Sequence, residues 1–224
     1  MSATRPHSEV MDLRVRQLTY GLTLFIHWVS AHWLFLVNLA LGLYSLAPFS
    51  APVLMVTGHT RAGELIYLAA SPFCHQLPER SFFLFGPQWV YSYEQLSQRL
   101  GGPVPLRYNG APDIGFKVAV CQRDVAIYLT MFIAGIAFVW LRHSLRPLTI
   151  KKFIALCVPM AIDGLGQLFG LWTSTWWSRV LTGGLFGLAC VWLVYPYLER
   201  GMSEVRQETS TTLDGWKRDG RTKG

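Results

Sequence analysis

Four long runs of apolar residues, separated by polar or charged segments, dominate the pattern of this chain. The runs cover residues 18–46, 125–141, 153–172 and 180–198. Each comes close to the roughly 20 residues that a helix needs to cross the hydrocarbon core of a bilayer. The pattern therefore predicts an all-α integral membrane protein with four transmembrane helices. Because the first run is longer than the apolar core of a signal peptide, we expect it to be retained.

The segment between the first two runs, residues 47–124, is predicted to fold outside the membrane. Its stretch 53–73 is apolar but carries His59, Arg61 and Glu64, which are costly in lipid, so we expect an amphipathic helix at the membrane interface. Aromatic residues at 81–85 and 89–91 predict a short hairpin. A short helix is predicted over 93–100, ending at Gly101-Gly102-Pro103.

Basic residues indicate the orientation. Of the 20 lysines and arginines, 13 lie in the N-terminal tail (1–17), the loop 142–152 and the C-terminal tail (199–224). By the positive-inside rule, both tails and this loop are cytoplasmic, while residues 47–124 and the turn 173–179 face outwards. We expect a multi-pass protein of the cell (inner) membrane. The C-terminal tail, residues 199–224, has few apolar residues that could anchor it and is predicted to be disordered.

Composition agrees with a membrane protein, since 51% of the residues are hydrophobic and 15% are charged. The net charge of +7 would suggest nucleic acid in a soluble protein, but here the basic residues cluster beside the apolar runs. The expected partners are the lipid bilayer and either further copies of the chain or a membrane complex, with no nucleic acid.

Two short motifs in the outer segment carry candidate metal ligands. Cys74-His75 and Cys121-x-x-Asp124 supply thiol, imidazole and carboxylate groups, which bind zinc or iron. Asp124 directly precedes an apolar run and is a natural helix N-cap. We therefore predict a metal site of Cys74, His75, Cys121 and Asp124. Adjacent residues rarely bind one metal together, so the alternative is that either Cys74 or His75 supports the site without binding the ion. A Cys74–Cys121 disulfide and unlinked thiols are the alternatives, and an outward-facing compartment permits the disulfide.

A second constellation lies in the third apolar run. Asp163 falls near mid-membrane, where an ionisable residue points to function, and Gln167 follows on the same helix face. These two are the candidate catalytic or proton-relay residues, and His32 is at a depth that would let it share a proton with Asp163. The alternative is a hydrogen-bonded Asp163 that joins helices.

Three arginines are predicted to lie on the outer side, at Arg80, Arg123 and Arg179. Guanidinium groups bind phosphate and carboxylate well, so we expect these residues to hold an anionic substrate. Contact with lipid headgroups, or pairing of Arg80 with Glu79, is the alternative.

These motifs resemble the predicted prokaryotic membrane proteins of domain-of-unknown-function family 2085. The resemblance rests on Cys74-His75-Gln76 with residues 78–86, on Cys121-Gln122-Arg123-Asp124, and on residues 159–167 followed by Arg179. Many members carry Cys-x-Arg-Cys where this chain has Asp124 in the last position. The resemblance implies a thiol-rich, metal-binding site and no particular reaction.

Three functions fit these observations. The first is a scaffold or complex subunit with an outward-facing metal site. The second is a membrane-embedded, metal-dependent enzyme that acts on an anionic, lipid-like substrate. The third is a small oligomeric transporter that uses Asp163. The sequence leaves the choice between enzyme and non-enzyme open.

Overall fold

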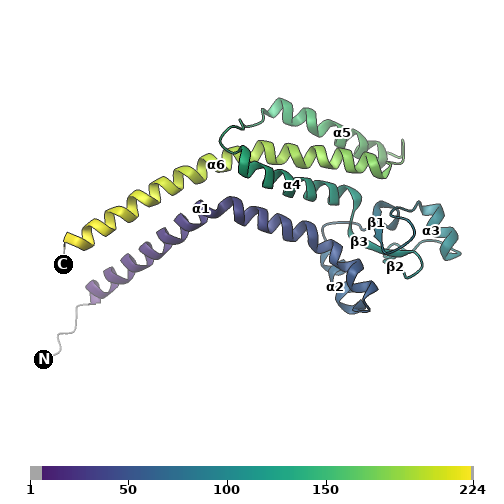
Figure 1. Cartoon of the computed structure of the whole chain (residues 1–224), viewed down its shortest axis with the longest axis horizontal. Coiled ribbons are helices and arrows are strands. Elements are labelled where there is room, and N and C mark those ends of the chain that lie inside the picture. Colours follow the sequence, from purple (N-terminus) through teal and green to yellow (C-terminus); the bar gives the residue numbers. More distant parts are fainter. Residues whose placement is uncertain (1–6, 223–224) are drawn as a thin grey trace. The chain divides into compact units, whose positions relative to one another are not determined.

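The structure, a computed structural model, describes the backbone of residues 7–222 and the side chains of residues 14–218. It divides into two units, one that joins residues up to Val37 with residues from Pro196, and one formed by Asn38–Tyr195. The helices are α1 (His7–Val56), α2 (Thr60–Ala70), α3 (Tyr93–Leu100), α4 (Gln122–Leu141), α5 (Ile150–Leu168) and α6 (Trp176–Thr222), and a 3-10 turn, η1, covers Pro78–Arg80. The strands are β1 (Ser81–Leu84), β2 (Gly110–Ala111) and β3 (Gly115–Cys121) (Figure 1).

Three of the described helices are long and apolar enough to cross a membrane, namely α1 from Arg14, α4, and α6 as far as Arg218. The chain is therefore a mostly helical membrane protein. The predicted third span corresponds to α5, whose 19 residues include Lys151, Lys152 and Asp163. With three charged residues, α5 is more polar than the apolar stretches of the three candidate spans. The fourth membrane crossing therefore remains a prediction. Helix α1 also continues past the predicted boundary at residue 46, as far as Val56.

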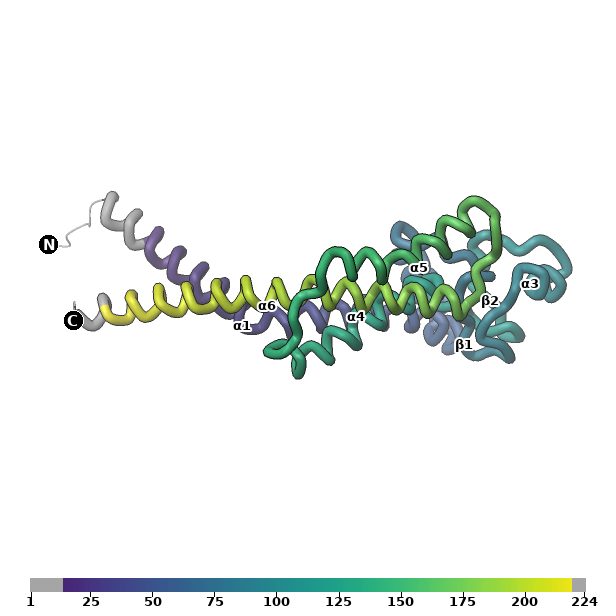
Figure 2. Tube along the Cα trace, turned by 90° about the horizontal axis from the view of Figure 1, so that it is seen from above, coloured from purple at the N-terminus to yellow at the C-terminus, as the bar shows by residue number. Residues whose placement is uncertain are grey.

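The C-terminal tail is helical where we expected disorder, because α6 runs without a break to Thr222. A seam with three- and four-residue spacing gives this half of α6 a mainly apolar face, made by Met202, Val205, Leu213 and Trp216 with the polar Thr209 between them. It lies along the N-terminal half of α1 (Figures 1 and 2): the Tyr20 and Trp216 rings are 5.2 Å apart, and His27 Nδ1 lies 3.0 Å from Thr209 Oγ1. Packing against α1 stabilises the C-terminal half of α6, and the overall polar composition of the tail does not indicate this contact.

Within Asn38–Tyr195, glycines allow α1, α4 and α6 to approach closely. A β-carbon on Gly183 would lie 2.8 Å from the Arg123 carbonyl oxygen, and one on Gly187 would lie 2.5 Å from that of Ile127. Helix α1 is tied to α4 where Asn38 Nδ2 donates to the Gly135 carbonyl at 3.0 Å. Small residues at these positions permit the close helix contacts typical of membrane bundles.

The segment between α1 and α4 contains a sheet, so the chain is not purely α-helical. The three strands are antiparallel in the order β1-β3-β2, with Ser81 opposite Cys121 and Leu84 opposite Phe116. The expected hairpin is replaced by this longer-range pairing, although Phe83 N–H still donates to the Trp89 carbonyl at 2.8 Å. Strand β3 is buried along Gly115–Val120 and takes the central place, which requires a partner on each side.

Local sequence explains the elements around the sheet. Helix α3 coincides with the predicted short helix, because Ser92 and Gln95 form a capping box and Gly101 ends the helix in a left-handed conformation. Gly58, with φ of +83°, makes the turn that separates α1 from α2. Figure 2 shows the strands and α3 gathered at one end of the Asn38–Tyr195 unit. There β3 leads directly into α4, so Cys121 and Asp124 lie at a strand–helix junction.

Candidate functional site

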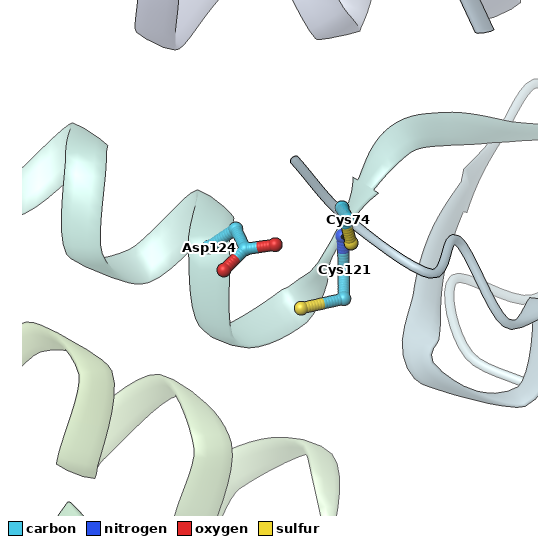
Figure 3. Close-up of side chains that lie close together, drawn as sticks. All are labelled: Cys74, Cys121 and Asp124. Atoms are coloured by element: carbon cyan, nitrogen blue, oxygen red, sulfur yellow. Dashed lines mark hydrogen bonds between the residues drawn. The ribbon is translucent and has the colours of Figure 1, made fainter. Parts of the chain in front are cut away.

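Cys74, Cys121 and Asp124 form a group that could hold a metal ion. One ligand atom from each lies within 4.8 Å of the other two. Cys121 ends β3 and occupies the N-cap position of α4, and Asp124 projects from the first turn of α4 towards the cysteines (Figure 3). Cys74 reaches them from the segment after α2, where its Sγ accepts the backbone N–H of Cys121 at 3.2 Å.

The arrangement differs from the predicted one in two respects. Helix α4 begins one turn earlier than expected, so Cys121, and not Asp124, occupies the N-cap position. His75 is exposed and is not part of the cluster of ligand atoms. Cys74 is buried, whereas His75 lines the same pocket with its side chain exposed. The two thiols are unlinked.

The two thiols differ in acidity. The hydrogen bond from the Cys121 thiol lowers the pKa of Cys74, although burial opposes this effect. The same bond, together with burial, raises the pKa of Cys121. Of the two thiols, Cys74 therefore loses its proton first, and a metal ion bound to both sulfurs would have to displace the proton of Cys121.

The ligand group opens into a small pocket of about 130 Å³. Arg80 lies on the wall of the same pocket, beside Cys74, Cys121 and Asp124. Three protein ligands with an open side are typical of zinc sites that bind a water or a substrate in the fourth position, whereas structural sites are closed by four ligands. A small ligand would reach a metal here without rearrangement of the chain.

Asp163 pairs with Arg123, and not with His32, whose depth would have allowed a shared proton. Arg123 Nη2 donates to Asp163 Oδ2 at 2.5 Å, and Ser178 Oγ donates to Oδ1 at 3.1 Å. The ring of His32 lies on Trp28, with centroids 5.0 Å apart. The depth of a residue along its helix gives its level but not the neighbour that its side chain faces.

Gln167 joins the other two predicted arginines. With its amide oriented to suit its neighbours, Gln167 Oε1 accepts from Arg80 Nη2 at 2.8 Å and from Arg179 Nη2 at 3.2 Å. Arg179 Nη1 also donates to Gln122 Oε1 at 3.0 Å. The structure thus brings Arg80, Arg123 and Arg179 together with Asp163 and Gln167, a set that we call the arginine cluster.

Lys117 is a buried residue that the sequence reasoning missed. Its side chain is fully buried in the middle of β3, where Nζ donates to the Gln76 carbonyl at 2.5 Å and lies 5.8 Å from the centre of the Tyr67 ring. Burial lowers the pKa of Lys117 to about 8. A lysine inside the otherwise apolar run Gly115–Val120 was the feature that could have revealed it.

Lys117 should make stability depend on pH. The folded protein releases this proton near pH 8, whereas the unfolded chain holds it until about pH 10.4. Between these values the unfolded state binds the Lys117 proton more tightly, so Lys117 contributes a rise of the free energy of unfolding with pH, of up to about 3 kcal/mol. We expect Lys117→Met to lose this rise in unfolding experiments from pH 7.5 to 10, and Lys217→Met, at an exposed site, to retain it. An unchanged pH dependence in Lys117→Met would contradict the assignment.

Comparison with known proteins agrees with a membrane protein. Residues 114–193 match the model of the DUF2085 family, described as a predicted membrane protein, which confirms the resemblance. That segment includes Cys121, Asp124 and most of the arginine cluster. An uncharacterized protein of the archaeon Methanocaldococcus jannaschii is 27% identical over 169 residues, which cover 72% of this chain and 89% of that protein. No solved structure matches the chain.

Proposed function

We propose that this protein holds one zinc or iron ion on Cys74, Cys121 and Asp124, and that it acts in the membrane as a metal-binding scaffold or complex subunit. The observation that carries the proposal is the approach of the three ligand atoms to within 4.8 Å of one another. Two thiolates and a carboxylate suit zinc, and they also suit iron. The family resemblance implies a thiol-rich site, and Asp124 in place of one thiol favours a mixed sulfur and oxygen ligand set over a purely soft one.

A metal-dependent enzyme acting on an anionic substrate is the second candidate, and the open side of the metal pocket favours it. When bound, the metal would supply a Lewis acid and an activated water. Arg80, on the pocket wall, would bind the negative charge of the substrate. Gln167 would then hold Arg80 in place, and Asp163 would hold Arg123. The transporter hypothesis has less support, because Arg123 and Ser178 already engage the Asp163 carboxylate.

We further propose four membrane crossings with both termini on one side. The N-terminal half of α1 packs against the C-terminal half of α6, and Tyr20 meets Trp216. Helix ends in contact lie on the same side of a membrane, so the number of crossings between them is even. Three crossings, by α1, α4 and α6, would be odd, and α5 is the helix available for the fourth. Its Lys151 and Lys152 belong to its first turn, where the headgroup region can accept them.

Single cysteines at exposed sites test this topology, in a background in which Cys74, Cys121, Cys157 and Cys190 are serine. A membrane-impermeant maleimide should label Gln98→Cys on intact cells. It should label Ser144→Cys and Ser203→Cys only after the cells are opened. Labelling of Ser203→Cys on intact cells would place the C-terminal part of α6 outside the cell and would contradict the proposed topology.

Metal analysis of freshly purified protein tests the proposed function. Protein prepared without chelators should contain about one zinc or iron per chain, as a site with three protein ligands predicts. It should also regain the metal after chelation and reloading. A wild-type protein that contains neither metal, and that takes up neither one, would overturn the proposal.

A further inference from the structure

The arginine cluster draws its cations from three separate parts of the chain. Arg80 ends η1, Arg123 lies in the first turn of α4, and Arg179 lies in the first turn of α6. Two of the three share one acceptor, the amide oxygen of Gln167. Like charges repel, so this convergence costs free energy unless negative charge offsets it.

The charges in the cluster do not balance. Among the residues that the structure describes, Asp163 is the one carboxylate that forms an ion pair with these arginines, and it pairs with Arg123. Arg80 and Arg179 donate to neutral amides, so ion pairs among the described residues offset one of the three positive charges, and Asp124 and Cys74 share the pocket of Arg80 without forming an ion pair with it. Arg179 is 5% exposed, and a guanidinium this deeply buried is strongly destabilising without a counter-charge.

Hydrogen-bond donors are also in excess. The Nε atoms of Arg123 and Arg179 are buried and have no partner in the described structure. Both arginines lie at helix N-termini, where the backbone dipole adds positive potential. The Arg123 side chain keeps 22% exposure and Arg80 lines the metal pocket, so solvent reaches two of the three arginines, whereas Arg179 is buried.

From this excess of charge and donors, we propose that Arg80, Arg123 and Arg179 bind a phosphate-type oxyanion. A phosphate monoester carries close to two negative charges near neutral pH, which matches the imbalance, and the fork of a guanidinium fits its oxygens. The ligand is the phosphate of an anionic lipid headgroup or a free phosphate. The inference names a ligand class for the second candidate function and does not require the bound metal.

Binding of inorganic phosphate and of phosphatidic acid tests the site. Calorimetry in an uncharged detergent measures free phosphate, and thermal unfolding in nanodiscs with or without phosphatidic acid measures the lipid. Arg80→Gln and Arg179→Gln should each weaken binding roughly tenfold or more, since a charge-assisted hydrogen bond is lost. Arg206→Gln, at an exposed site on α6, should bind as wild type does. Arg80→Lys keeps the charge but loses the fork, so it tests the site if Arg179→Gln does not fold.

The outcomes separate the sources and the two proposals. Saturable phosphate binding in detergent assigns a free ligand, and stabilisation by phosphatidic acid alone assigns a lipid. Arginine-dependent binding that survives chelation supports the anion site even if the protein proves to hold no metal. Binding that is absent for both probes, that is unchanged in the arginine variants, or that disappears on chelation would overturn the inference.

Discussion

Replacing Asp163 by Asn should lower the free energy of unfolding by about 2–3 kcal/mol. The substitution removes the carboxylate that accepts from Arg123, so that, among the described residues, none of the three arginines of the cluster keeps an ion pair. Breaking a fully buried pair costs about 3–5 kcal/mol, and partial exposure of this pair reduces the effect. A neutral, hydrogen-bonded Asp163 would tolerate Asn with little change. Thermal or denaturant unfolding in detergent measures the difference.

The double variant Arg123→Gln with Asp163→Asn is the matched control. It removes both charges of the pair, so it should recover a large part of the stability lost in Asp163→Asn. The change from Lys217→Met, which breaks an exposed pair with Asp214, should stay below about 0.5 kcal/mol. If Asp163→Asn and the double variant are equally destabilised, the loss of the ion pair is not the cause of the lower stability.

The second large effect concerns the metal. Cys121→Ser and Cys74→Ser should each lower the bound metal at least tenfold, because each removes one of three thiolate or carboxylate ligands. The double variant Cys157→Ser with Cys190→Ser removes two thiols from α5 and α6 and should keep the metal. Elemental analysis of protein purified in parallel gives the comparison.

His75→Ala separates the three-ligand site from the predicted four-ligand one. Because His75 is exposed and lies outside the ligand cluster, its loss should leave the metal content at the wild-type level. A loss comparable to that of Cys121→Ser would restore His75 as a ligand. Retention of metal by Cys121→Ser would remove the cluster from consideration.

The sequence predicted those features that depend on neighbouring residues. Apolar runs located the helices α1, α4 and α6, and the breaker Gly101-Gly102-Pro103 located the end of α3. The pairing of β1 with β3 was missed because it joins segments more than 30 residues apart, and no local pattern reports such a partner. The helical tail was missed for a related reason, since its apolar seam gains meaning only beside α1.

The candidate site shows the same limit. Residue chemistry singled out Cys74, Cys121 and Asp124, and the structure brings them together. It also singled out the three arginines and Asp163, but not their partners, because a sequence gives no rotation of one helix about another. Lys117 was overlooked because a single lysine in a short apolar segment does not indicate from sequence whether its side chain is buried.

The glycines of α6 have a consequence for the arginine cluster. Arg179, Gly183 and Gly187 recur at intervals of four and therefore share one face of the helix. Gly183 lies against the carbonyl of Arg123, so the backbones of α6 and α4 are close together there. This backbone distance sets the separation from which the Arg123 and Arg179 side chains extend. A larger side chain at Gly183 would separate the arginines while leaving both of them in the sequence. The lack of a side chain at Gly183 therefore helps to set the distance between the guanidinium groups of Arg123 and Arg179.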